Sequence, residues 1–146
     1  MAGNTIQNDL DPDISIGIAL PLDHSTEVGF FERTPTMLEQ MKSNIKNLLL
    51  TRKGERLGNP EFGSDLYFSI FEQEGDVESK IEESIRSAMS RWLPDVIINN
   101  IKTEFSSRNT IVVALQFAIN IDTTSEEEVT IEVESDFMES TPSSPL

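Results

Sequence analysis

The fold is decided by one stretch, Thr110-Ile111-Val112-Val113-Ala114-Leu115-Gln116-Phe117-Ala118-Ile119-Asn120-Ile121. Successive side chains of a strand point to opposite faces of a sheet, so residues at every second position share a face. One face of this stretch carries only large apolar residues: Ile111, Val113, Leu115, Phe117, Ile119 and Ile121. The opposite face is less apolar, because it includes Gln116 and Asn120. The pattern predicts a strand with one face in the core.

Further strands are expected on both sides of this stretch. Residues 96–105 precede a turn-forming sequence, Ser106-Ser107-Arg108-Asn109, which predicts a hairpin. Residues 129–133 alternate Val or Ile with Thr or Glu, which predicts a half-exposed acidic strand. Near the N-terminus, residues 14–20 predict a short strand, and residues 28–32 are a candidate partner for it. In that strand we expect four side chains to point inward: Ile14, Ile16, Ile18 and Leu20.

Two amphipathic helices are expected between these strands. The first begins at Thr34-Pro35-Thr36, where Thr36 and Glu39 have capping-box spacing, and is expected to stop at Gly54. Its apolar stripe consists of Leu38, Met41, Ile45, Leu48 and Leu49. The second follows Asp76 as N-cap and ends before Pro94. Its buried face is expected to contain Val77, Ile81, Ile85, Ala88, Met89 and Trp92. Between the two, Leu66, Phe68, Ile70 and Phe71 indicate a short helix or turn.

These elements predict an α+β fold, in which two long helices pack on a small antiparallel sheet with an N-terminal strand or hairpin. A chain of 146 residues accommodates one ordinary domain. We expect an extended arm over residues 1–13, a single domain over 14–136 and a disordered tail over 137–146.

The composition of the chain argues against several classes of function. The chain has 26 acidic and 11 basic residues, which argues against a nucleic-acid or anionic-membrane surface. It has no Cys and one His, so disulfides, thiolate nucleophiles and multi-histidine metal sites are excluded within one chain. No signal peptide or membrane span is expected from the sequence, and no cofactor is expected either.

Almost all of the excess of acidic over basic residues lies at the two ends of the chain. All 11 basic residues lie within residues 33–108, whereas residues 109–146 contain eight acids and no base. The acidic ends act either as solvated, solubilising segments or as a surface for a basic partner, and charge alone does not decide between them.

The segment 47–66, NLLLTRKGERLGNPEFGSDL, carries the most specific signal. It resembles the signature of the GPW-like baseplate wedge family of contractile phage tails, to which a type VI secretion baseplate component is related. The matching pattern is a Leu-rich helix end, then Thr-x-x-Gly-Glu-Arg, then Pro-x-Phe-Gly-x-x-Leu. Residues 17–22 resemble the strand that precedes the helix in many members. One departure is Leu93-Pro94-Asp95, where some branches carry Glu-Pro-Arg.

The resemblance implies a structural subunit in the tail baseplate of a virion, made in the host cytoplasm. It implies that the chain is a platform on which tail-sheath subunits begin to assemble, through strands shared with the sheet of residues 96–135. Implied partners are sheath subunits and other wedge proteins, with tail tube or hub proteins as further candidates. We expect a monomer in isolation and several copies in the particle, with no enzymatic activity.

Candidate site residues follow from the motif and from the outer strand. Those assigned to partner binding are Arg52, Glu55, Arg56, Glu61, Trp92, Val129, Ile131 and Val133. Those assigned to holding the loop are Gly54, Pro60, Phe62, Gly63 and Leu66. Arg56 could instead pair inside the loop with Glu55, Glu61 or Asp65, and Trp92 could belong to the core.

The alternative function is a lysozyme-like, baseplate-associated peptidoglycan hydrolase. Such an enzyme needs two carboxylates at a fixed separation, for example Glu55 with Glu61 or Asp65. A chain with 26 acids contains many such pairs by chance, so the assembly role is favoured.

Overall fold

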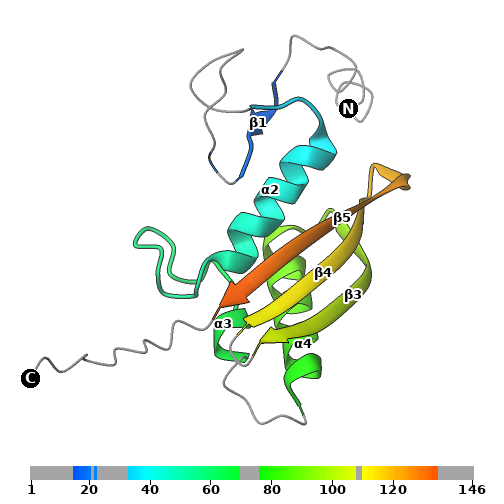
Figure 1. Cartoon of the computed structure of the whole chain (residues 1–146). Helices are drawn as coiled ribbons and strands as arrows, with labels where there is room; N and C mark the ends of the chain where they lie inside the picture. The colour runs from blue at the N-terminus through cyan, green and yellow to red at the C-terminus, as the bar shows by residue number, and fades with distance from the viewer. Residues whose placement is uncertain (1–14, 21, 23–32, 70–75, 108–109, 135–146) are drawn as a thin grey trace, which may run out of the picture.

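A three-stranded antiparallel sheet forms one layer of the molecule (Figure 1). The structure is a computed structural model that describes residues 15–20, 22, 33–69, 76–107 and 110–134. The sheet consists of β3 (Val96–Ser107), β4 (Thr110–Ile119) and β5 (Asp122–Glu134), in the order β3-β4-β5. β4 is the middle strand. Its strongly apolar face suits this position, because a middle strand is covered by the core along its whole length.

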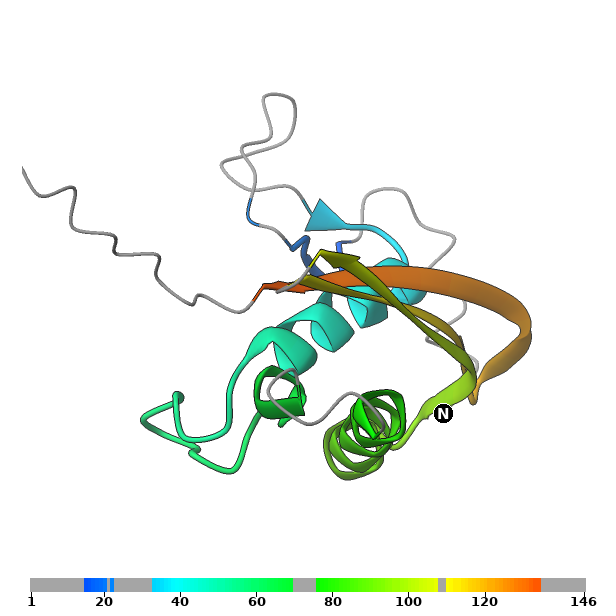
Figure 2. The same ribbon diagram turned by 60° about the horizontal axis from the view of Figure 1, so that its bottom comes forward.

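Two helices cover one face of this sheet (Figure 2). α2 (Met37–Leu50) packs against β5, and α4 (Val77–Trp92) packs against β3. Side chains from β4 alternate between buried and half-buried, as the sequence predicts. The core between sheet and helices includes the fully buried Phe117, Leu115, Ile45, Ile81 and Ile85. The α+β class and the small antiparallel sheet are therefore confirmed.

The helix starts follow the expected capping residues. The side chain of Thr36 accepts a hydrogen bond from the Glu39 amide at 3.3 Å, which is the N-cap contact that the sequence predicts. Asp76 is the N-cap residue of α4, although its side chain makes no capping hydrogen bond. α4 ends at Trp92, shortly before Pro94. α3 (Leu66–Ser69) is the short helix expected between them, and the positions of Ile70 and Phe71 lie outside the described residues.

The first helix ends earlier than expected. It stops at Leu50, because Thr51 adopts extended backbone angles and donates both its amide and its hydroxyl hydrogen to the Asn47 carbonyl oxygen. Gly54 is therefore not the residue that terminates the helix. Arg52 and Lys53 lie beyond the helix, and the last turn of the helix contains no basic residue.

The strand boundaries differ at both ends of the last hairpin. β4 ends at Ile119, and Ile121 is 45% exposed instead of facing the core. β5 begins at Asp122, well before the expected start at residue 129. Residues 126–128 pair with β4, and their carboxylates have partners: the Gln116 side chain donates to Glu128 at 3.1 Å, and Lys42 of α2 forms an ion pair with Glu127 at 2.5 Å.

The N-terminal strand is shorter than expected, and Ile18 does not point inward. β1 (Gly17–Ile18) pairs with β2 (Arg33–Thr34), and both contact α2. A Cβ atom on Gly17 would lie 1.8 Å from the Gln40 side-chain oxygen, so Gly17 is the residue that faces α2. Ile18 is consequently 48% exposed, contrary to the prediction, whereas Ile16 and Leu20 are half-buried. Ile14, the candidate partner strand at 28–32, the arm at 1–13 and the tail at 137–146 lie outside the described residues.

The one-sided sheet predicts that truncations on its two faces have unequal effects. Phe117→Ala removes a fully buried ring from β4 and should lower the free energy of unfolding by about 3–5 kcal/mol. Val112→Ala, on the opposite face of the same strand, should cost about 1 kcal/mol or less. Urea unfolding followed by circular dichroism measures both, and equal losses would show that the second face is also packed.

Candidate functional site

The residues of the sequence motif form a loop, Thr51–Ser64, which we call the clamped loop. Its two ends are held together, because the Ser64 amide donates to the Thr51 carbonyl oxygen at 2.9 Å. The Ser64 hydroxyl donates to the Leu49 carbonyl oxygen at 2.7 Å, and Ser64 is 1% exposed. A buried serine therefore fixes the loop to the end of α2, and it satisfies a carbonyl that the helix leaves without an internal partner.

Two glycines supply backbone angles that other residues avoid. Gly54 has φ +89° and Gly63 has φ +124°, which lie in the left-handed region that favours glycine. A Cβ atom on Gly63 would lie 2.4 Å from the Thr51 carbonyl oxygen, whereas a Cβ atom on Gly54 would meet nothing within 4 Å. Gly63 is thus required both for its angle and for the close approach of the two loop ends.

Backbone hydrogen bonds inside the loop define its shape. The Gly54 amide donates to the Pro60 carbonyl oxygen at 2.7 Å, and the Phe62 amide donates to that of Asn59 at 3.1 Å. Leu57, at the far end of the loop, is fully exposed. The loop projects beyond the end of α2 (Figure 2). It is therefore an internally bonded projection of the chain.

Side-chain contacts connect the loop to α4. The Phe62 ring meets the Trp92 ring edge-on, with 5.3 Å between centroids. Glu61 forms an ion pair with Arg91 of α4 at 3.0 Å. Trp92 is half-buried, so it serves as the support of the loop as well as the end of the apolar stripe of α4.

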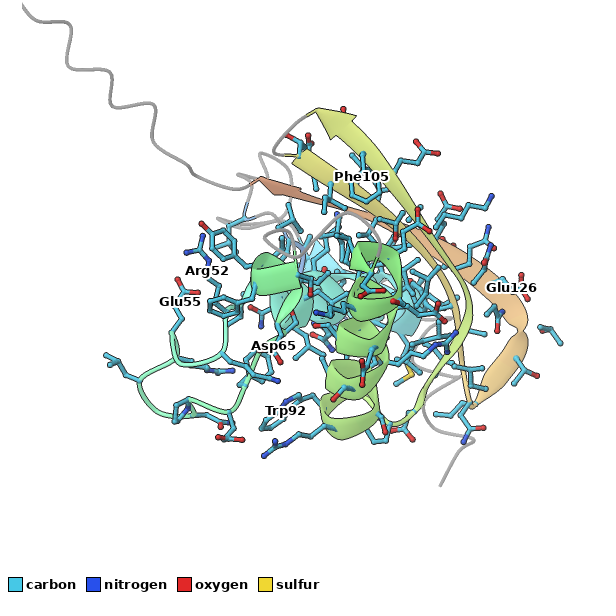
Figure 3. All side chains as sticks on the ribbon, turned by 90° about the horizontal axis from the view of Figure 1, so that it is seen from below. Arg52, Glu55, Asp65, Trp92, Phe105 and Glu126 are labelled. Carbon is cyan, nitrogen blue, oxygen red and sulfur yellow. The ribbon has the colours of Figure 1, made fainter. Side chains whose placement is uncertain are left out.

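The arginines of the motif stack on aromatic rings. The Arg52 guanidinium lies 3.5 Å from the centroid of the Tyr67 ring, and that of Arg56 lies 4.7 Å from the centroid of Phe62. Both arginines are exposed, as is Glu55, whose carboxylate accepts a hydrogen bond from the Arg52 amide at 3.2 Å. Figure 3 shows Arg52 and Glu55 on the same side of the molecule. These three residues, with Glu61, give the loop a charged surface.

The carboxylates proposed for hydrolysis already have partners. Glu61 pairs with Arg91, and Asp65 pairs with Lys53. Their side chains are 67% and 48% exposed. A general acid in glycoside hydrolysis is a desolvated carboxyl group, so these two exposed, paired carboxylates do not form such a site. Among the described residues, no group of three or more potential metal ligands is present.

The two edges of the sheet differ in regularity. Pairing between β4 and β5 runs without a shift from Thr110 opposite Glu134 to Ala118 opposite Glu126. Pairing between β3 and β4 is interrupted twice, between Ile98 and Asn100 and between Phe105 and Ser107. Irregularities of this kind twist an edge and obstruct further pairing. β5 has one irregularity, opposite the step from Ala118 to Ile119, and in the described part of the chain it pairs only with β4, so its other edge is open.

The side chains of the outer strand that were assigned to partner binding are buried. Val129, Ile131 and Val133 are 2%, 2% and 8% exposed, and they pack against the helices. They can contact a neighbouring chain through their backbone, but their side chains belong to the core. From residue 126 onward, the side chains of β5 described as exposed are instead Glu126, Glu128, Thr130 and Glu132.

Three parts of the site were not identified from the sequence: Ser64, the Lys53–Asp65 pair and Arg91. A serine inside a turn-rich segment gives no indication that it is buried. The partners of charged side chains depend on how α4 docks.

No helix among the described residues has the length and apolar character needed to cross a membrane.

A family model and a relative found by comparison with known proteins carry the same description. Residues 36–134 match the model of the family described as baseplate wedge protein gp25. The baseplate wedge protein gp25 of Enterobacteria phage T4 is 27% identical over 119 residues, which cover 80% of this chain and 82% of the relative.

Solved structures share the fold. A Geobacter sulfurreducens protein provisionally named a tail lysozyme has a TM-score of 0.61 at 17% identity, over 68% of this chain and 91% of that one. A chain of a type VI secretion system baseplate complex has a TM-score of 0.51 at 12% identity, over 66% and 92%. At these identities the two structures support the architecture alone.

The geometry of the clamped loop predicts a graded effect of alanine at its glycines. Gly63→Ala combines a strained φ with a clash against the Thr51 carbonyl, and it should lower the free energy of unfolding by at least about 2 kcal/mol. Gly54→Ala adds only the strain and should cost about 1–2 kcal/mol. Gly58→Ala, which has open space, is the matched control and should stay within about 0.5 kcal/mol of the parent. Urea unfolding of the three variants tests this order, and a neutral Gly63→Ala would contradict the clamp.

Proposed function

The chain belongs to the baseplate wedge protein gp25 family, and on this premise we propose that it seats the first tail-sheath subunits of a contractile tail. In this proposal it is a structural baseplate subunit, and sheath chains add strands to the open edge of β5. The observation that supports the proposal most is the pairing of β5 with β4, which runs without a shift over residues 126–134 and leaves the outer edge of this segment unpaired within the described residues.

Strand addition uses the part of β5 that remains accessible. An added strand is held by backbone hydrogen bonds, so the burial of the Ile131 side chain does not prevent pairing at this position. The edge of β3 is a poorer acceptor, because two register shifts interrupt it. Among the described strands of this sheet, residues 126–134 of β5 therefore offer the longer uninterrupted edge for a partner strand.

The clamped loop is the proposed contact for other wedge proteins. Arg52, Glu55 and Arg56 are exposed on a loop whose shape is fixed by Ser64 and Gly63. The exposed Leu57 at its far end adds an apolar contact. A projection that is already ordered loses little conformational entropy on binding, which favours association.

The proposed location is the tail baseplate, with several copies per particle and with tail tube or hub proteins as further neighbours. The domain is proposed to span residues 14–136, between an N-terminal arm and a C-terminal tail. The isolated chain is proposed to be a monomer, because a net charge of −15 makes its acidic surfaces repel one another.

The proposal assigns no catalytic activity to the chain. Purified protein should leave peptidoglycan intact, and Glu61→Gln should change nothing, because Glu61 is an exposed partner of Arg91. Release of soluble fragments from peptidoglycan, measured with an active lysozyme as reference, checks this. Cleavage that disappears in Glu61→Gln would support the hydrolase instead.

Site-specific cross-linking tests which edge receives the sheath. The chain contains no Cys, so a single Cys carries a photoreactive group at one known position. Thr130 on β5 and Lys102 on β3 are both exposed and lie in one row across Ala114. We expect Thr130→Cys, incorporated into assembled tails, to form an adduct with a sheath subunit.

Lys102→Cys is the matched control and should form no sheath adduct, since it lies on the interrupted edge. An adduct from Lys102→Cys but not from Thr130→Cys would assign the sheath to the other edge. Normal sheath on tails that lack this protein would contradict the seating function itself.

A further inference from the structure

A groove runs beside the open edge of β5, and we call it the edge groove. Its volume is about 1010 Å³. Four of its lining side chains are large and apolar, and they come from four different segments: Leu20, Leu50, Phe62 and Ile131. The other lining residues are Lys46, Asn47, Thr51, Glu55, Arg56, Thr130 and Glu132. The groove therefore joins α2, the clamped loop and the free edge of β5 in one concave surface.

The apolar part of the groove is available to a partner. Leu50, at the end of α2, is 51% exposed although it lies beside the core. The helix ends there because Thr51 turns the chain into the clamped loop, and the loop then carries Phe62 along the side of the groove. An added side chain would cover apolar surface that otherwise contacts water.

The two faces of β5 would impose different requirements on a strand added beside it. Neighbouring side chains of paired strands lie on the same face of the sheet. Residues opposite Val129, Ile131 and Val133 would point toward the helices and therefore into the edge groove. Residues opposite Glu128, Thr130 and Glu132 would point to the uncovered face.

The carboxylates on these two faces of β5 have different kinds of partner. On the helix side, Glu127 is neutralised by Lys42. On the uncovered face, Glu126 and Glu128 accept hydrogen bonds from the uncharged amides of Asn99 and Gln116. Glu132 forms no ion pair with any residue of the described ranges. Three carboxylates on one edge strand thus lack a cationic partner within this part of the chain.

We propose that the edge groove and β5 together recognise one kind of segment, an extended strand of a neighbouring protein in which apolar residues alternate with Lys or Arg. The apolar side chains enter the groove, and the cations lie over Glu126, Glu128 and Glu132. This inference rests on the proposed strand-accepting function and adds the chemistry of the accepted strand. Backbone pairing supplies adhesion, whereas the alternation selects the partner and its register.

Peptide binding to the full-length protein tests the proposal. The probe is a peptide that alternates Leu and Lys and is long enough to span Glu126–Glu134, used at concentrations where it stays monomeric. We expect it to shift the amide resonances of β5 and of Leu50 in nuclear magnetic resonance spectra. A peptide that alternates Leu and Glu should bind at least about tenfold more weakly, and added salt should weaken the Lys peptide.

Variants separate the two parts of the recognition surface. Glu132→Lys should weaken the Lys peptide about tenfold, because an attraction becomes a repulsion, and Leu50→Ser should weaken both peptides about tenfold. Glu78→Lys on α4 makes the same charge change on an exposed residue of another element and should leave affinity unchanged. Circular dichroism confirms that each variant is folded.

The outcomes distinguish this inference from the function on which it rests. Equal affinity of the Lys and Glu peptides, or unchanged affinity in Glu132→Lys and Leu50→Ser, would overturn the inference. If sheath adducts still form from Thr130→Cys in that case, strand acceptance stands and only the proposed alternation is wrong. Absence of both peptide binding and sheath adducts would overturn the two together.

Discussion

The backbone of a strand has hydrogen-bonding groups on both sides, and a three-stranded sheet leaves two edges to be paired by something else. Here the sheet buries one face on α2 and α4, so each strand keeps its position through its apolar side chains. β5 is held in place by Val129, Ile131 and Val133, which fixes its outer edge without using it. The buried face therefore fixes the position of the outer edge of β5, and the proposed function depends on that fixed position.

The clamped loop adds shape beside this edge. Ser64 bonds to the end of α2, Gly63 allows the two loop ends to meet, and Phe62 packs on Trp92 of α4. Four residues of this loop, Thr51, Glu55, Arg56 and Phe62, line the edge groove together with residues of α2 and β5. A motif of small and turn-forming residues thus serves two purposes, because the same fixed loop offers a charged surface and borders the groove.

Local sequence patterns predict most of the fold and only part of the site. The alternation around Phe117 identifies the core face of β4, and Thr36 and Asp76 mark the helix starts, because these signals act over a few residues. The sequence did not predict the helix and strand boundaries that depend on residues distant in the chain. α2 ends next to Thr51, whose carbonyl oxygen accepts a hydrogen bond from Ser64, and β5 begins at Asp122 because it pairs with β4. Gly54 and Gly63 were identified as loop-holding residues from their positions in the motif. The burial of Ser64 and the Glu61–Arg91 pair could not be predicted, because they depend on the docking of α4.

A density map of the assembled tail, at a resolution that separates strands, tests the central claim most directly. We expect a strand from a sheath subunit to be hydrogen-bonded along β5, with side chains of that strand in the edge groove. A β5 edge that faces solvent in the assembled particle, with the sheath attached to another surface of this chain, would contradict it.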